Sequence, residues 1–329
     1  MTDEVIIDVD HLTKDYGHGR GVFDVSIKVH KGECYGYLGP NGAGKSTTIR
    51  HIMGFSSPST GKITVLGKDS FKNTAEILKE VGYLPGEPSL PAGLDGMGFL
   101  RMMQDMRGER NDERLNYLLD LFKLNPNVNV KQMSLGEKRK LAVVAAFMND
   151  PQVLILDEPT SGLDPIMQEV FINFIIEEKK RGKTILLSSH IFSEVDATCD
   201  TISIIKDGVH VSTFKANDLK HKDSQTYIIH FNDVSVADKY ADSIKDTEFT
   251  VVDKNDVLKT VTVEFKRKKY KEFFDTLKGL DVKDFEEKVF TLQDYFMSFY
   301  KEEKTFGGLE GVKAERADNE EKVAVTEDK

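Results

Sequence analysis

Cysteine is scarce in this chain of 329 residues, which contains only Cys34 and Cys199. The two lie too far apart in sequence for a C-x-x-C metal or redox motif, so disulfide-stapled and zinc-ribbon proteins are excluded. The first residues also lack the pattern of a secretory signal peptide. We therefore expect a chain without disulfides in a reducing, cytoplasmic environment, with both cysteines acting as small buried residues.

Long apolar runs are missing too. The longest, Leu141–Met148, is far shorter than the roughly 18–20 residues that a helix needs to cross a bilayer, so a membrane role is expected to come through a partner. Positive charge is not in excess either, since 55 acidic residues outnumber 45 basic ones and the formal net charge is −10. Nucleic-acid backbones are bound by basic patches, so no nucleic-acid partner is expected.

A glycine-rich loop is what the sequence does offer. Residues Gly39–Thr47 fill the pattern G-x-x-x-x-G-K-[ST] at every fixed position, between a strand-like run, Cys34–Leu38, and a helical run, Ser46–Met53. Glycines let successive N–H groups converge on a phosphate, and the following helix adds its positive end. In this pattern Lys45 reaches the β- and γ-phosphates and the Ser46 hydroxyl holds Mg²⁺. The loop residues predicted to bind nucleotide are Gly39, Asn41, Gly42, Ala43, Gly44, Lys45, Ser46 and Thr47.

Strands and helices alternate downstream of this loop, which predicts an α/β fold with a mainly parallel sheet. Two stretches before the loop, Val5–Val9 and Val22–Val29, alternate in polarity and predict an antiparallel start. The later expected strands are 61–67, 81–85, 153–156, 184–188, 202–205 and 209–214. The expected helices are 74–80, 97–106, 113–124, 166–180 and 193–199.

The character of the chain changes near residue 216. We expect a linker at 217–223, then an accessory domain at 224–305 with the order βαββαβ, which is that of a small ferredoxin-like α+β fold. A capping pattern at Thr291–Asp294 opens a closing amphipathic helix. Residues 306–329 are rich in Gly, Ala and Glu with little apolar content, so they are expected to form a disordered acidic tail.

A second motif follows the apolar strand Val153–Leu156, which ends in two acids, Asp157 and Glu158. Asp157 can orient Mg²⁺, and Glu158 is placed to polarise a water for attack on a γ-phosphate. A kinase would rarely need the second carboxylate, because its nucleophile is a substrate hydroxyl. The pair therefore favours hydrolysis of the nucleotide.

Three further stretches identify a family. They are Met133–Arg139, Pro159–Pro165 and Leu187–His190. With the two motifs above, they resemble the signature motif, D-loop, switch histidine, Walker A loop and Walker B strand of the ATP-binding cassette (ABC) ATPases. The resemblance runs from about Val5 to Phe214. It implies that the nucleotide is ATP, with Mg²⁺, and that residues 1–216 form a P-loop NTPase domain. That domain would have a RecA-like core, an antiparallel β subdomain and a helical subdomain at about 87–150.

The resemblance also implies roles for single residues. Tyr16 matches the aromatic residue that stacks on adenine. Glu158 matches the general base, and His190 matches the histidine that contacts the γ-phosphate and the attacking water. Together with Lys45, these two are the predicted catalytic residues.

A second subunit is implied in the same way. Ser134 and the Gly136 amide match the groups that bind the γ-phosphate held by the opposite subunit, and Asp164 matches the residue that communicates between the two sites. We therefore expect a head-to-tail dimer, a homodimer, with two ATP molecules between the subunits.

Two departures from the family pattern stand out. Leu135 replaces the first glycine of the signature motif, and Glu137 replaces its glutamine. Gly86 stands where the family usually has a glutamine that binds Mg²⁺ and senses the γ-phosphate, and Glu87 follows it. We expect slower hydrolysis or altered coupling as a result.

The chain most resembles the ATPase subunits of bacterial drug, peptide and lantibiotic exporters, because it combines one cassette with an extra C-terminal domain. We expect a motor subunit that works with a separate integral membrane permease, at the cytoplasmic face of the cell membrane. An importer ATPase subunit is an alternative reading. A soluble, non-transport ABC ATPase acting in translation or DNA maintenance is another.

Overall fold

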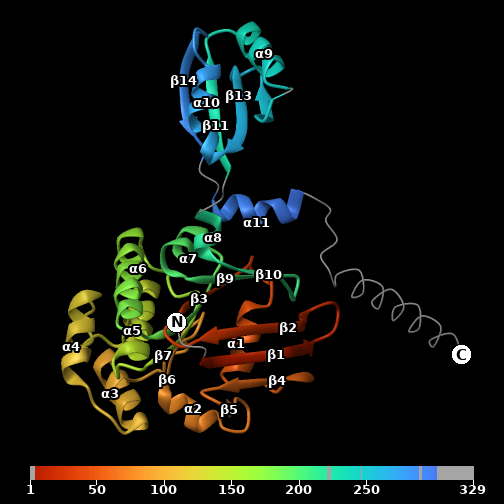
Figure 1. The fold of residues 1–329 in the computed structure, drawn as a ribbon. Helices are drawn as coiled ribbons and strands as arrows, with labels where there is room; N and C mark the ends of the chain where they lie inside the picture. The colour runs from red at the N-terminus through yellow and green to blue at the C-terminus, as the bar shows by residue number, and fades with distance from the viewer. Residues whose placement is uncertain (1–3, 221–223, 246, 289–290, 302–329) are drawn as a thin grey trace, which may run out of the picture. The chain divides into compact units, whose positions relative to one another are not determined.

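The computed structural model describes residues 4–220, 224–245, 247–288 and 291–301 (Figure 1). The chain divides after Ala216 into two compact units, called here the N-terminal unit and the C-terminal unit. The expected tail at 306–329 lies outside the described residues. None of the helices in the described ranges is long and apolar enough to cross a membrane.

The N-terminal unit is organised around a sheet of ten strands in the order β5-β4-β1-β2-β10-β9-β3-β8-β7-β6. The strands are β1 Val5–Asp15, β2 Gly21–His30, β3 Cys34–Leu38, β4 Thr60–Val65, β5 Lys68–Asp69, β6 Val81–Leu84, β7 Val153–Asp157, β8 Thr184–Ser189, β9 Thr201–Lys206 and β10 Val209–Lys215. The helices are α1 Lys45–Ile52, α2 Thr74–Glu80, α3 Gly96–Arg107, α4 Asp112–Leu121, α5 Leu135–Phe147, α6 Pro165–Lys180 and α7 Phe192–Thr198.

The strands β9, β3, β8, β7 and β6 are paired in parallel and form the core of this sheet. Every residue of β3, β7 and β8 is buried, as expected for strands covered on both faces. Parallel pairing brings the carboxyl ends of neighbouring strands together: Leu38 is level with Ser189, and Asp157 with Ser188. The mainly parallel α/β fold expected from the sequence is confirmed, and this edge is where the loops of the site begin.

The other half of the sheet is antiparallel. β1 pairs with both β2 and β4, with Val9 opposite Ile27 on one side and opposite Ile63 on the other. These three side chains are buried, so the alternation of the sequence does mark the inward face of the strands. The antiparallel subdomain is confirmed. The two-residue strand β5 was not expected from the sequence.

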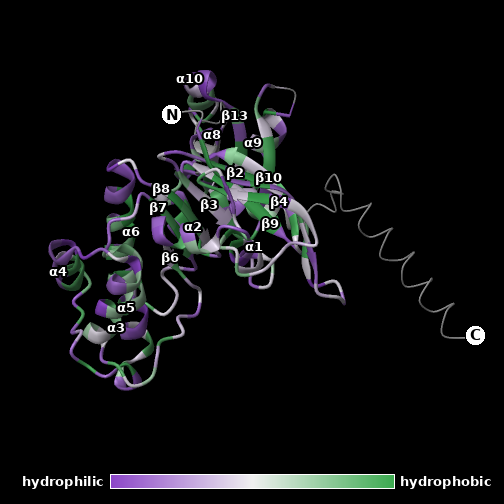
Figure 2. Cartoon of the chain, turned by 90° about the horizontal axis from the view of Figure 1, so that it is seen from below, coloured by the Kyte–Doolittle hydropathy of each residue, from purple (hydrophilic) through white to green (hydrophobic). Residues whose placement is uncertain are grey.

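A helical region made of α3, α4 and the start of α5 lies at the far end of the N-terminal unit from β1 and β2 (Figure 1). Side-chain caps begin the first two helices: Asp95 accepts from the Gly98 N–H and Asn111 from the Arg114 N–H. In Figure 2, α3 and α4 each carry both hydrophilic and hydrophobic residues. Their apolar residues pack inward, with Leu100 and Leu118 fully buried.

A buried group of charges ties α4 to the end of α6. The Glu178 carboxylate is 2% exposed and lies 2.7 Å from Arg114 Nη2 and 2.9 Å from Lys183 Nζ. Lys183 also contacts Asp150, which bonds Arg181 in turn. Because each buried charge has a partner of opposite sign, the network fixes the helical region on the core.

The C-terminal unit contains a four-stranded antiparallel sheet in the order β12-β13-β11-β14. Its elements are α8 Ala216–Lys220, which spans the division between the units, β11 Ser224–Phe231, α9 Val234–Ser243, β12 Thr250–Asn255, β13 Thr260–Lys266, α10 Tyr270–Thr276, β14 Val282–Glu287 and α11 Leu292–Lys301. From β11 to β14 the elements follow one another in the order βαββαβ, and the first and third strands, β11 and β13, lie in the middle of the sheet. This is the ferredoxin-like arrangement expected from the sequence. Phe265 and Phe273 stack at 4.2 Å in its core.

Part of the expected linker at 217–223 is helical, since α8 runs through Lys220. The polar composition of this stretch hides a short helix, because Ala216 and Leu219 keep local helix propensity between polar residues.

Candidate nucleotide-binding site

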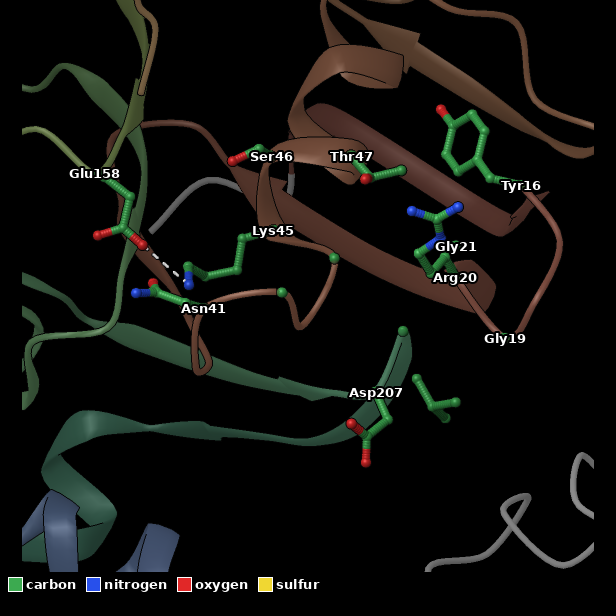
Figure 3. Close-up of a pocket in the computed structure, with 14 residues that line it drawn as sticks. Tyr16, Gly19, Arg20, Gly21, Asn41, Lys45, Ser46, Thr47, Glu158 and Asp207 are labelled. Atoms are coloured by element: carbon green, nitrogen blue, oxygen red, sulfur yellow. Dashed lines mark ion pairs between the residues drawn. The ribbon is translucent and has the colours of Figure 1, made fainter. Parts of the chain in front are cut away.

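A cavity of about 720 Å³ lies at the carboxyl edge of the sheet, over the loop between β3 and α1. Gly44 precedes α1 with φ +105°, and a Cβ at this position would lie 2.7 Å from Val22 Cγ1, so glycine is required there. The predicted residues that line the cavity are Tyr16, Asn41, Gly42, Gly44, Lys45, Ser46, Thr47 and Glu158 (Figure 3). Gly39 and Ala43 belong to the loop but lie outside the cavity wall.

Lys45 connects the loop to the predicted general base. Its Nζ donates to the carbonyl oxygens of Gly39 at 2.6 Å and Pro40 at 3.1 Å, and lies 2.9 Å from Glu158 Oε1. The other carboxylate oxygen of Glu158 is 2.6 Å from His190 Nδ1. The structure thus brings the three predicted catalytic residues into one chain of contacts (the Lys45–Glu158 ion pair is the dashed line in Figure 3).

The backbone at Glu158 is in the left-handed region, with φ 48°. Only glycine, asparagine and aspartate adopt this region readily, so the conformation is strained. The Glu158 N–H donates to the Ser188 carbonyl at 3.1 Å and approaches the Ser188 hydroxyl at 3.2 Å. The neighbouring strand therefore holds the amide side of the strained residue.

Asp157 precedes Glu158 at the end of β7 and is 3% exposed. The Ser188 hydroxyl donates to its Oδ1. Its Oδ2 faces Gly86, where a Cβ would lie 3.1 Å away. Position 86 therefore looks directly onto the carboxylate predicted to bind the metal.

The outer end of the cavity holds Tyr16, which is 52% exposed, and beside it Arg20 (Figure 3). Asp207 and Gly208, in the turn between β9 and β10, close the wall. Sequence reasoning found Tyr16 but not the other three. The Gly-rich turn around Arg20 and the Asp-Gly turn were visible, but their meeting depends on β2 pairing with β10.

The predicted residues Ser134, Gly136 and Asp164 also lie outside the cavity wall, as do Asp157 and His190. Ser134 caps α5 in a capping box, in which its hydroxyl accepts from the Glu137 N–H at 3.3 Å and its own N–H donates to Glu137 Oε2 at 2.8 Å. The Ser134 hydroxyl also donates to Glu137 Oε2 at 2.8 Å. These bonds hold the pKa of Glu137 below its usual value. Asp164 caps α6 by accepting from the Met167 N–H at 3.0 Å.

Arg139 is a residue that sequence reasoning quoted but gave no role. It lies on α5, is 1% exposed, and among the residues that the structure describes its guanidinium donates only to main-chain carbonyl oxygens. The acceptors are Pro85 at 2.6 Å, Gly86 at 3.0 Å, Pro159 at 3.0 Å, Asp157 at 3.1 Å and Glu158. Burial lowers the pKa of Arg139 to about 10, which leaves it charged at neutral pH.

Glu194 on α7 is a second residue that was missed. Burial raises the pKa of this carboxyl to about 7. Its Oε2 accepts from the Ser189 hydroxyl at 2.5 Å, and that hydroxyl also accepts from the Ile191 N–H at 2.9 Å. Glu194 thus braces the turn that carries His190. The sequence shows a glutamate in a helix, which is an ordinary surface residue unless its burial is known.

The fold and the loop define a P-loop nucleotide-binding protein. Comparison with known proteins narrows the class: residues 22–161 match the family model described as "ABC transporter". The bacitracin transport ATP-binding protein BcrA of Bacillus licheniformis is 32% identical over 295 residues, 89% of this chain and 96% of that protein. The chain belongs to the ABC transporter ATP-binding family, so it is an ATP hydrolase of the ABC type.

Two further matches agree. The Nod factor export ATP-binding protein I of Rhizobium etli is 36% identical over 219 residues, 65% of this chain and 69% of that protein. A solved structure described as the ATP-binding subunit of an ABC transporter has a TM-score of 0.61 and 31% identity, and covers 65% of this chain and 92% of its own. The family membership predicted from the motifs is confirmed.

Proposed function

We propose that this protein is the ATP-hydrolysing motor subunit of an ABC exporter, working with a separate membrane permease. The observation that carries the proposal is the contact chain Lys45–Glu158–His190 at the wall of a phosphate-loop cavity. Relatives described as bacitracin transport and Nod factor export proteins support export over import.

Lys45 and the loop amides would bind the β- and γ-phosphates, while Tyr16 would stack on the adenine. A phosphate competes with Glu158 for the Lys45 ammonium, because both are anions within its reach. ATP binding would then release one oxygen of Glu158, which could accept a proton from the attacking water. His190, bonded to the other oxygen, would keep the carboxylate turned towards that water.

Mg²⁺ fits the residues at this edge. The Ser46 hydroxyl and the Asp157 carboxylate are hard oxygen ligands, and Asp157 Oδ2 is the oxygen that Ser188 leaves free. The ion would neutralise charge on the phosphates as the γ-phosphate leaves. Gly86 contributes no further ligand, so water would have to take the place of the usual glutamine.

A second subunit would complete the site. Ser134, Gly136 and Asp164 lie outside the cavity of their own chain, and in this proposal they bind the nucleotide of another copy. The surface beside them is apolar and open: Leu135 is 70% exposed and Ile166 69%. Such side chains are expected to be covered in an interface. We infer a homodimer with two shared sites.

The permease would dock in a second cavity of about 580 Å³, between the sheet and the helical region. Its wall is largely apolar and includes Phe55, Leu90 and Phe99, with Met103 and Met106 from α3. Methionines adapt to a partner's shape, as a docking surface for a cytoplasmic loop of a membrane protein requires. This contact would place the chain at the cytoplasmic face of the membrane.

The accessory domain has its place in this scheme. We propose that 217–223 acts as a connection and 224–305 as an independently packed domain. The support is its separate aromatic core, in which Tyr227 and Phe265 stack at 5.8 Å. Whether it regulates hydrolysis is testable by deleting it and assaying transport.

The first test is the substitution Glu158→Gln. It keeps the shape of the side chain but removes the base, so hydrolysis should fall by about 10²–10⁴-fold. ATP should still bind, and light scattering should show an ATP-dependent dimer. Retained turnover would remove Glu158 from the role of base.

The second test concerns the permease. Met106→Glu places a charge in the docking cavity, and Met102→Glu is the matched control on the same helix, outside the cavity wall. Co-purification of a membrane protein from solubilised membranes should be lost with the first variant and kept with the second. Equal recovery with both would contradict docking at this cavity.

A further inference from the structure

The environment of Arg139 is unusual for a stabilising residue. A buried guanidinium loses its hydration, and such a charge is normally matched by a carboxylate in direct contact. Within the described part of the chain no carboxylate lies within ion-pair distance of it; Asp157, Glu158 and Glu194 act on it only through space. Every bond that it makes goes to main-chain carbonyls. A leucine or methionine would fill this volume at a lower desolvation cost but would leave these carbonyls without donors, so what the arginine supplies is the set of main-chain bonds.

The carbonyls that Arg139 binds belong to two loops at the catalytic edge. Pro85 and Gly86 belong to the loop that faces Asp157, and the others run from Asp157 through Pro159. A guanidinium carries five N–H donors in one plane, so it can hold both loops at a fixed spacing. A lysine ammonium has three donors around a point and cannot reproduce this fork.

Glu158 is the residue most affected. Its strained backbone is held on the amide side by Ser188 and on the carbonyl side by Arg139. Without the second bond the peptide after Glu158 is free to relax towards an ordinary conformation, and its carboxylate would turn with it.

We propose that Arg139 is a positioning residue that holds the general base Glu158 in its active orientation and links it to the helix that begins at Ser134. Arg139 lies five residues after Ser134, within the first turns of the same helix. A displacement of the N-terminal end of α5 is therefore transmitted to Glu158 through the helix and the Arg139 side chain. The inference rests on the proposed shared site, in which Ser134 meets the partner's nucleotide. Closure at one site would then align the base at the other.

The test uses the full-length protein with Arg139→Lys, which keeps the charge, and Arg139→Gln, which removes it. Lys138→Gln is the matched control, because it removes a charge from the neighbouring position. We expect kcat to fall more than about tenfold in both Arg139 variants, with the ATP dissociation constant nearly unchanged. The thermal midpoint should fall as well, because buried carbonyls lose their donors, and the double-mutant cycle described next separates that loss from positioning. The control should keep the wild-type kcat. If Arg139→Lys folds and keeps its kcat, or if neither Arg139 variant folds, the proposal is overturned.

A double-mutant cycle separates positioning from a general structural role. If Arg139 acts through the Glu158 carboxylate, Arg139→Lys should lower the residual single-turnover rate of a Glu158→Gln chain by less than about twofold. The double variant should also form the ATP-dependent dimer. An equal loss in both backgrounds, or loss of the dimer, overturns the inference. A wild-type chain without ATPase activity would instead overturn the proposed function itself, so the two failures are distinguishable.

Discussion

The two units of this protein bury different kinds of side chain. The N-terminal unit encloses charged groups such as Lys45, Arg139, Glu178 and Glu194, each less than about a tenth exposed. In the described part of the C-terminal unit, the buried polar residues are two threonines, Thr260 and Thr262, and the rest of the core is aliphatic or aromatic. Both units have a hydrophobic core, but among the described residues only the N-terminal unit bears the desolvation cost of buried charged groups.

The difference shows where each unit places its constraints. Burying a charge is unfavourable unless partners are supplied in the right geometry, so such groups need a precise scaffold. In the N-terminal unit that precision fixes loops that handle a nucleotide. The C-terminal unit needs only complementary shape, as its stacked rings show. Function in this chain is thus concentrated where the interior is polar.

The largest expected effect comes from removing a ring from the C-terminal core. Phe273→Ala leaves a cavity among Tyr227, Phe265 and Phe274 and should destabilise that unit by about 4 kcal/mol. Limited proteolysis should then cleave within 224–288, while ATP hydrolysis stays near wild type. Phe147→Ala is the matched control, since it opens a cavity in the N-terminal unit and should lower hydrolysis as well. Loss of hydrolysis with Phe273→Ala would mean that the units are not separate in function.

Breaking the buried charge network around Glu178 should destabilise the protein somewhat less than the Phe273→Ala substitution does. Glu178→Gln leaves Arg114 and Lys183 without their shared carboxylate, and we expect a loss of about 3 kcal/mol in the unfolding free energy of the N-terminal unit. Urea unfolding followed by circular dichroism would measure it. Glu177→Gln, which removes an exposed partner of Lys180, should change stability by less than about 0.5 kcal/mol. Similar values for the two variants would contradict the assigned role of burial.

The free energy of unfolding should depend on pH through Glu194. Its folded pKa of about 7 exceeds the unfolded value of 4.5, so the folded state binds more protons between these values and stability falls as pH rises through this window. The loss between pH 5 and pH 8 should be about 2.5 kcal/mol, and Glu194→Gln should abolish it. Unfolding free energies of both chains at the two pH values provide the measurement. If the unfolding free energies of the wild-type and Glu194→Gln chains differ by the same amount at both pH values, Glu194 does not titrate in this range.

The smallest effect concerns position 86. Gly86→Gln would return the amide that the family usually places beside Asp157, and turnover at limiting Mg²⁺ should rise by about two- to fivefold. Gly86→Ala adds the same Cβ without the amide and should not raise turnover. Equal behaviour of both variants, or no change in Mg²⁺ dependence, would contradict the prediction that this glycine slows hydrolysis.

Much of the fold could be predicted from local patterns. The alternation of polarity in β1 and β2 predicted their inward faces, and the apolar run of β7 predicted a buried strand. The order of elements predicted the fold of the C-terminal unit. The phosphate loop was equally visible, because only glycine adopts the backbone that Gly44 needs. Roles carried by buried polar groups were not visible. Arg139 and Glu194 read as ordinary helix residues, and only tertiary packing shows what they touch.

The strained backbone of Glu158 has a consequence for the history and engineering of the protein. A residue with φ 48° is about 1 kcal/mol less stable there than glycine would be. Glycine at position 158 would relieve that strain, but it would leave the buried ammonium of Lys45 without its carboxylate partner. Heat resistance alone should therefore not select glycine here, because the lost ion pair outweighs the relieved strain.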